Sequence, residues 1–154
     1  MNIVHHALDV RAPIETVFAA ITTSDGLASW WTRDVQAGTA EVGSLFRFSF
    51  RGVFNPHLRI TEIEAPLRVT FEGVDSHDAW GETTIRFVLE SINGATLVRF
   101  WHHMGPERSS DGVASANFTW AYYLNSLRLL CERGEGAPYQ PGSSKARVGA
   151  ASFE

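Results

Sequence analysis

A long helix near the end of the chain constrains the fold more than any other part of the sequence. Its apolar positions recur at intervals that place them on one helical face. These positions are Trp120, Leu124, Leu127 and Cys131, and Asn117 and Val113 extend the stripe backwards. The periodicity runs from about Gly112 to Arg133, and Gly134 is a typical helix stop. A helix of about 21 residues is roughly 30 Å long, so it is long enough to cross a whole curved sheet.

The residues before this helix predict that sheet. In residues 45–51 the hydrophobic period changes to two, and the three phenylalanines of this segment share one face. Further strands are predicted at residues 3–10, 57–64, 67–73, 82–91 and 95–103. Asn93 and Gly94 form a strong tight-turn signal between the last two. Short turns between successive strands indicate an antiparallel sheet.

Two short helices are predicted after the first strand. Pro13 suits the first helical position, because its missing N–H would have no partner there. The buried stripe of this helix comprises Ile14, Val17, Phe18 and Ile21. Residues 23–25 offer capping oxygens for a second helix that ends near Trp30 and Trp31.

These elements predict a single α+β domain at residues 1–134. A curved antiparallel sheet wraps around the long C-terminal helix, and two short helices follow the first strand. Residues 135–154 are rich in Gly, Pro, Ser and Ala, so they are expected to form a tail outside the core, flexible or loosely docked.

The order of these elements resembles the helix-grip fold of the START-like superfamily, also called SRPBCC or Bet v-like. Four segments are similar to the branch of this superfamily named for the activator of heat-shock protein 90 ATPase. They are VRAPIETVFAAITTSDGLASWW (10–31), ITEIEAPLRVTFEG (60–73), GATLVRFWHHMGP (94–106) and TWAYYLNSLRLLCERG (119–134). His102 falls at the histidine position of that branch. Its co-chaperone members carry an additional client-binding domain, for which 154 residues leave no room.

The resemblance implies a cavity between sheet and helix that binds a small hydrophobic or amphipathic molecule. The inward-facing positions are aromatic enough for such a pocket, or they simply fill a core. The predicted ligand-binding residues are Trp30, Phe46, Phe48, Phe50, Phe71, Phe87, Phe100, His102, Asn117 and Trp120. A cavity of this kind should measure on the order of 300–1,000 Å³.

No catalytic residue is assigned, and the role of His102 stays open. It is either an acid–base or hydrogen-bonding group at the cavity mouth, or a histidine whose hydrogen bonds are satisfied by the backbone. Relatives in the superfamily include cyclase and hydratase enzymes, for which His102 would act with Glu82 or Tyr122. Cys131 lies in an apolar stripe and is expected to be an inert packed thiol.

No metal site and no cofactor are predicted. Neighbouring histidines in a strand point to opposite faces, so neither His5-His6 nor His102-His103 can chelate one ion. Residues 75–78, Asp-Ser-His-Asp, contain metal-binding side chains without a recognised spacing.

The amino-acid composition limits the classes of binding partner that the protein can have. With 17 acidic and 13 basic residues the net charge is −4 and no basic block exists, which argues against nucleic acid. No stretch has the roughly 20 apolar residues that a membrane span needs, and the start shows no secretory signal. The lone cysteine suits a reducing cytoplasm. The expected partners are a small hydrophobic molecule, a chaperone or a second copy of the chain.

Three functions therefore compete: ligand-binding domain, cyclase- or hydratase-type enzyme, and protein-interaction module. A buried, connected acid–base pair would favour the enzyme. A filled core beneath an exterior that carries an exposed patch would favour the interaction module.

Overall fold

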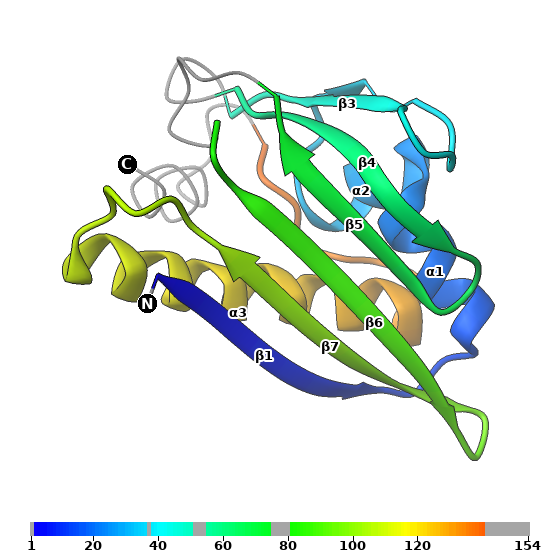
Figure 1. Cartoon of the computed structure of the whole chain (residues 1–154). Coiled ribbons are helices and arrows are strands. Elements are labelled where there is room, and N and C mark those ends of the chain that lie inside the picture. The colour runs from blue at the N-terminus through cyan, green and yellow to red at the C-terminus, as the bar shows by residue number, and fades with distance from the viewer. Residues whose placement is uncertain (1, 37, 51–54, 75–80, 141–154) are drawn as a thin grey trace.

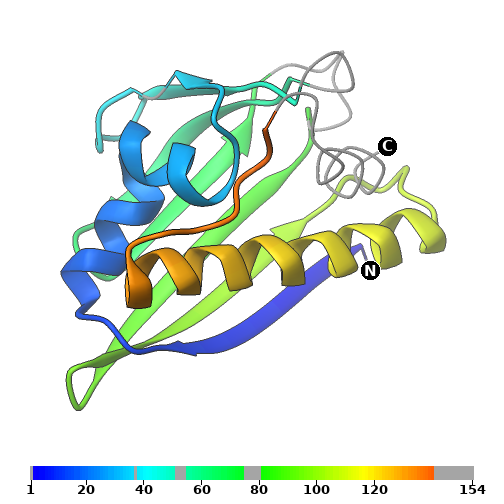
Figure 2. The same ribbon diagram turned by 180° about the vertical axis from the view of Figure 1, so that it is seen from behind.

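The computed structural model describes residues 2–36, 38–50, 55–74 and 81–140 (Figure 1). Within them a seven-stranded antiparallel sheet has the order β1-β7-β6-β5-β4-β3-β2. The strands are β1 (Ile3–Val10), β2 (Val35–Gln36), β3 (Leu45–Phe48), β4 (His57–Glu64), β5 (Arg68–Gly73), β6 (Thr84–Ile92) and β7 (Ala95–His103). The helices are α1 (Ile14–Thr22), α2 (Ser24–Trp30) and α3 (Ser110–Arg133). All three lie on the same face of the curved sheet (Figure 2), which confirms the helix-grip prediction.

The β6–β7 hairpin forms at the predicted turn. Asn93 and Gly94 both have positive φ, 50° and 83°, and a two-residue hairpin turn of this kind needs positive φ at both positions. Ile92 pairs with Ala95 directly across the turn. The first strand then completes the sheet by pairing with the last one, with Val4 opposite His102.

The junction of α1 and α2 is held by the predicted cap. The Thr23 hydroxyl accepts a hydrogen bond from the backbone N–H of Gly26 at 3.1 Å, which satisfies a donor that the first turn of α2 leaves open. Gly26 lies so close to α1 that a Cβ there would be 2.6 Å from the carbonyl oxygen of Ala20. The second helix can therefore cross the first only with glycine at this contact.

The buried face of α3 corrects one expectation. It comprises Ala116, Thr119, Trp120, Tyr123, Leu124, Ser126 and Leu127. Asn117, predicted to face the sheet, is exposed. Successive helical residues are about 100° apart, so adding Thr119, Tyr123 and Ser126 rotates the buried face away from Asn117. These residues face inward because α3 packs on α2 as well as on the sheet.

The chain continues from α3 back across α2. Tyr139 is 3% exposed, its ring contacts Phe50, and its N–H donates to the carbonyl of Trp31 at 2.8 Å. A Cβ at Gly136 would be 2.4 Å from the carbonyl oxygen of Ser29, so the crossing is tight. The expectation that this segment lies outside the core therefore does not hold for Tyr139. The domain boundary at residue 134 stays a prediction.

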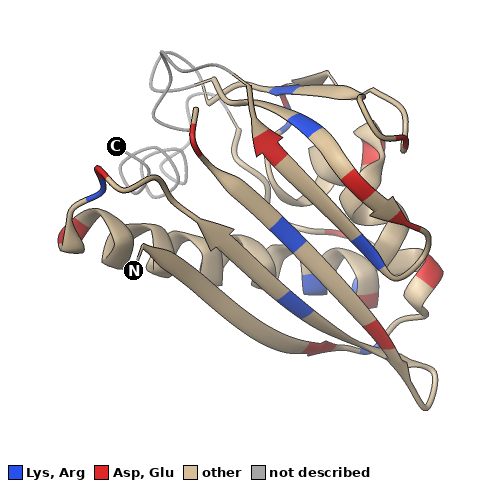
Figure 3. Cartoon of the chain, viewed as in Figure 1, with Lys and Arg blue, Asp and Glu red and all other residues tan. Residues whose placement is uncertain are grey.

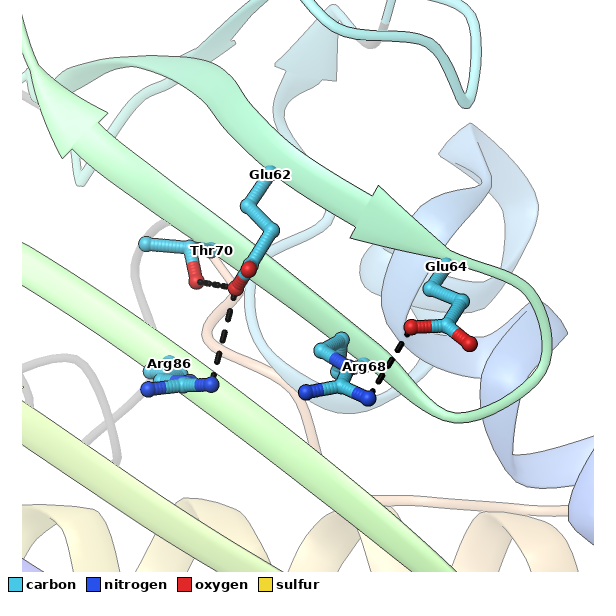
Figure 4. A network of polar contacts seen from close by, with 5 residues as sticks. All are labelled: Glu62, Glu64, Arg68, Thr70 and Arg86. Atoms are coloured by element: carbon cyan, nitrogen blue, oxygen red, sulfur yellow. Dashed lines mark hydrogen bonds and ion pairs between the residues drawn. The ribbon is translucent and has the colours of Figure 1, made fainter.

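The outer face of the sheet is polar (Figure 3). Arg68 pairs with Glu64 at 2.9 Å, and Arg86 pairs with Glu62 at 3.6 Å. Thr70 also donates to Glu62 (Figure 4). These side chains are about one third to one half exposed, so this face is solvated and the core lies entirely on the helix side.

Candidate functional site

The predicted ligand-binding residues are all buried except Asn117. The buried ones are Trp30, Phe46, Phe48, Phe50, Phe71, Phe87, Phe100, His102 and Trp120, and none is more than 3% exposed. They come from α2, from α3 and from the concave side of the sheet, as the period-two pattern predicts. Whether they bind a ligand is a separate question that depends on the space between them.

Trp31 is the central ring that the sequence reasoning left out of the site. It stacks on Trp30 with ring centres 5.8 Å apart and contacts Phe48 at 4.5 Å and Trp120 at 5.2 Å. It is the C-cap of α2, where the chain leaves the helix and helical spacing no longer predicts direction. The Trp30-Trp31 pair is the signal in the sequence, but helical spacing predicts an inward direction only for Trp30.

The space between sheet and helices is filled by these rings. An enclosed cavity of about 10 Å³ lies among Leu27, Trp30, Trp31, Phe48, Leu58, Phe71, Ile85, Phe87 and Trp120. A void of this size is about one water-sized probe. The space among these nine residues is therefore far smaller than the chamber that the sequence predicts.

His102 joins the sheet to α3 through a chain of hydrogen bonds. The indole N–H of Trp120 donates to His102 Nδ1 at 2.9 Å. That nitrogen must be an acceptor, so the imidazole proton is on Nε2 and is donated to the hydroxyl of Thr83. The Thr83 hydroxyl in turn donates to the backbone carbonyl of His103 at 3.3 Å.

The surroundings of His102 keep it neutral. The imidazole is 1% exposed, and its burial, with smaller contributions from Arg108 and His103, lowers its pKa to about 3. A group with this pKa stays unprotonated near neutral pH, so it is poorly suited to general acid–base catalysis there. His102 is therefore a buried histidine with its hydrogen bonds satisfied, as one of the two sequence-based hypotheses holds. Its partners are the side chains of Trp120 and Thr83 and not the backbone.

The structure does not assemble the acid–base pairs considered for an enzyme. Thr83 faces the core just before β6, so its neighbour Glu82 faces outward and is exposed. Tyr122 is two residues from Trp120, about 200° around α3, and its ring packs on Tyr123. Neither side chain is placed to exchange a proton with His102.

The remaining reactive groups in the described ranges form neither a metal-binding cluster nor an activated nucleophile. No three His, Cys, Asp or Glu side chains there gather in a way that could hold a metal ion. Burial, with a smaller contribution from Glu132, raises the pKa of the Cys131 thiol to about 11, which disfavours the reactive thiolate. The segment 75–78 lies outside the described residues. Among the described helices, none is long and apolar enough to span a membrane.

Two grooves lie where β1 and α3 run side by side. The larger, about 650 Å³, is bordered by Asn2, Ile3, Val4, His5, Ser110, Val113, Ala114 and Asn117. The smaller, about 220 Å³, is bordered by His6, Ala7, Leu8, Ala121, Leu124, Asn125 and Arg128. We call the exposed residues along these grooves, together with Phe118, the β1/α3 face.

The β1/α3 face is uncharged over most of its length. No Asp, Glu, Lys or Arg occurs in α3 between Asp111 and Arg128, or in β1 before Asp9, and Figure 3 shows both elements free of charge there. Phe118, on the adjoining surface of α3, is 71% exposed. The uncharged run of the helix is visible in the sequence, whereas helical periodicity indicates only the side that faces the core.

The fold and its closing helix define a START-like, helix-grip domain. A family model described as "Activator of Hsp90 ATPase homolog 1-like protein" matches residues 11–132. The match covers most of the chain, so the chain belongs to this family. None of the curated proteins compared with it matches.

Solved structures agree with this assignment. The chain is 34% identical to the protein in the solution structure of the Aha1 dimer from Colwellia psychrerythraea, with a TM-score of 0.78 over 88% of this chain and 100% of that one. SSP2350 from Staphylococcus saprophyticus has 18% identity and a TM-score of 0.72, over 90% and 99% of the two chains. CalU16 from Micromonospora echinospora has 20% identity and a TM-score of 0.69, over 99% and 84%. The last two share the fold alone.

Proposed function

We propose that this chain is a protein-interaction domain that associates with a second copy of itself. The observation that carries the proposal is the uncharged β1/α3 face, with Phe118 71% exposed. Large exposed apolar groups on an uncharged surface are typical of protein contacts. The outer face of the sheet offers the opposite chemistry, because ion pairs cover it.

Two further observations support an interaction domain. The cavity among the central aromatic rings measures about 10 Å³, far below the volume that small-molecule sites usually have. The 34% identical relative, all of whose chain this protein covers, was solved as a dimer.

The mass of the protein in solution tests the proposal. Sedimentation velocity and light scattering over a wide range of protein concentration are expected to show a dimer that dissociates on dilution. A mass of one chain at every concentration would contradict self-association. A chaperone is the first other partner to examine, by measuring ATP hydrolysis by purified heat-shock protein 90 with and without the protein.

A small apolar ligand is the second candidate function. It is favoured by the wholly apolar wall of the enclosed cavity, where a ligand could pack against the rings of Trp30, Trp31 and Trp120. Binding would require these rings to move, because the void is about one water in size.

An environment-sensitive hydrophobic dye separates the two candidates. For the filled core we expect no dye fluorescence with the folded protein. Saturable fluorescence that is lost when Ile85, which lines the cavity, is replaced by Trp would instead favour the ligand, because the new ring would occupy the ligand's space.

A further inference from the structure

The two edges of the sheet differ in how well they are protected. At one edge β2 contains only two residues, and so short an edge offers little to pair with. At the other edge β1 contains eight residues, pairs with β7 without a bulge and contains neither Lys nor Pro. Proteins normally protect a long edge with one of these devices, so the free edge of β1 is suited to receive another strand.

The register shows which backbone groups of β1 are available. The N–H of Met104 donates to the carbonyl of Asn2 at 2.8 Å, and hydrogen-bonded pairs alternate along an antiparallel ladder. The even-numbered residues of β1 therefore direct their N–H and C=O groups toward β7. The odd-numbered residues Ile3, His5, Ala7 and Asp9 direct theirs away from the sheet.

We propose that the free edge of β1 pairs antiparallel with β1 of a second copy, with Ala7 at the twofold axis and the two α3 helices alongside. The two sheets then form one continuous sheet across the dimer. This inference rests on the proposed self-association and names the surface that carries it.

Charge is the first reason why the occupant is a second copy. In a twofold interface, residues near the axis face their own copies, so a charged surface would repel itself. The run from Ile3 to Leu8 carries no Asp, Glu, Lys or Arg. With Ala7 on the axis, Asp9, the only charged residue of β1, lies opposite His5 of the second copy.

The details around His5 fit this register. Its ring stacks on Trp101 and its Nδ1–H donates to the carbonyl of Phe100 at 2.9 Å. When both ring nitrogens are protonated, the other one, Nε2–H, can donate to the carboxylate of Asp9 of the second copy. On the groove side the same register sets His6 against Leu8 of the second copy, two residues that are only half-buried in one chain.

The exposed residues of α3 complete the face. Ala114, Asn117, Ala121 and Asn125 border the grooves and are exposed, and the row ends at the exposed Arg128, whose guanidinium donates to the side chain of Asn125. Alanine and asparagine are small and uncharged, so a second α3 can approach closely across the axis. Phe118, the residue after Asn117, is a large apolar side chain that is 71% exposed at the margin of this row.

Proline at position 7 is the sharpest variant for a test. The N–H of Ala7 points to the free edge, so Ala7→Pro leaves the β1–β7 ladder intact, and proline is tolerated in edge strands on this side. At the axis the two Ala7 residues exchange both of their inter-copy hydrogen bonds. Losing both should raise the dissociation constant of the dimer at least about tenfold.

Ala7→Lys provides a second variant that does not depend on backbone geometry. It places two like charges at the axis, so it should also shift the protein to monomer. Ser91→Lys adds the same charge at an exposed position of β6 and should leave the dimer unchanged. Circular dichroism and thermal melting establish that each variant is folded.

Amide hydrogen exchange gives an independent readout. The amides of His5, Ala7 and Asp9 should become protected only at concentrations where the dimer forms, and those of His6 and Leu8 should be protected in the monomer too. A wild-type dimer that both Ala7 variants leave intact would overturn the β1 interface while retaining self-association. A wild-type protein that stays monomeric at all concentrations would overturn both.

Discussion

Acid should destabilise this protein through His102. The group is neutral in the folded state with a pKa of about 3, against 6.5 for an ordinary histidine. Between these values the unfolded chain binds a proton that the folded one does not, so the free energy of unfolding decreases as pH falls. The contribution is complete above pH 6.5 and is lost progressively toward pH 3, at about 1.4 kcal/mol per pH unit. From pH 7 to pH 5 this amounts to about 2 kcal/mol.

Chemical denaturation at pH 7 and pH 5 measures this effect. Other groups titrate over the same range, so wild-type protein is compared with His102→Gln, in which the titrating group is gone. The variant should start less stable, because it disturbs the bonds to Trp120 and Thr83, and should lose about 2 kcal/mol less on acidification. His103→Gln at the exposed neighbouring position should retain the acid sensitivity. If His102→Gln and wild type lose equal stability, His102 is not held neutral and the proton assignment is refuted.

Three further substitutions probe the core. Trp120→Phe keeps a ring but leaves His102 Nδ1 without its donor, so denaturation should show a loss of about 1–3 kcal/mol; an unchanged stability would mean that the bond is not formed. Tyr139→Ala empties the space beside Phe50 and should cost about 2–5 kcal/mol, whereas a loss under about 1 kcal/mol would show that the segment is not docked. Val98→Trp should overpack the filled core by about 1–3 kcal/mol or more; a variant as stable as wild type would reveal a larger void.

Most of the fold follows from periodicity in the sequence. The alternation around Phe46 and Phe48, the Asn93-Gly94 turn and the Gly134 stop each have a local physical cause, and each is found as predicted. The inward direction of the strand aromatics follows from the same alternation. These features depend on near neighbours, which is why one sequence suffices to place them.

The sequence-based predictions fail where a residue packs against two elements at once, or where its segment has no periodic pattern. Thr119 and Ser126 are polar but buried, because α3 packs on α2 and on the following segment; Ser126 donates to the carbonyl of Trp30 at 2.8 Å. The burial of Tyr139 could not be predicted, because a single aromatic residue in a Gly- and Pro-rich segment has no periodic pattern. The size of the cavity depends on how rings from distant elements interlock, and no local pattern specifies that.

The pairing of β1 with β7 also sets the order in which the protein can fold. Val4 lies opposite His102, so the first strand to be synthesised has no partner until about a hundred residues later. Closing so long a loop slows folding relative to a protein with local contacts. During translation β1 is therefore exposed as a strand with one charged residue and with both edges open. It can pair wrongly with another nascent chain on the same messenger RNA until β7 has been synthesised.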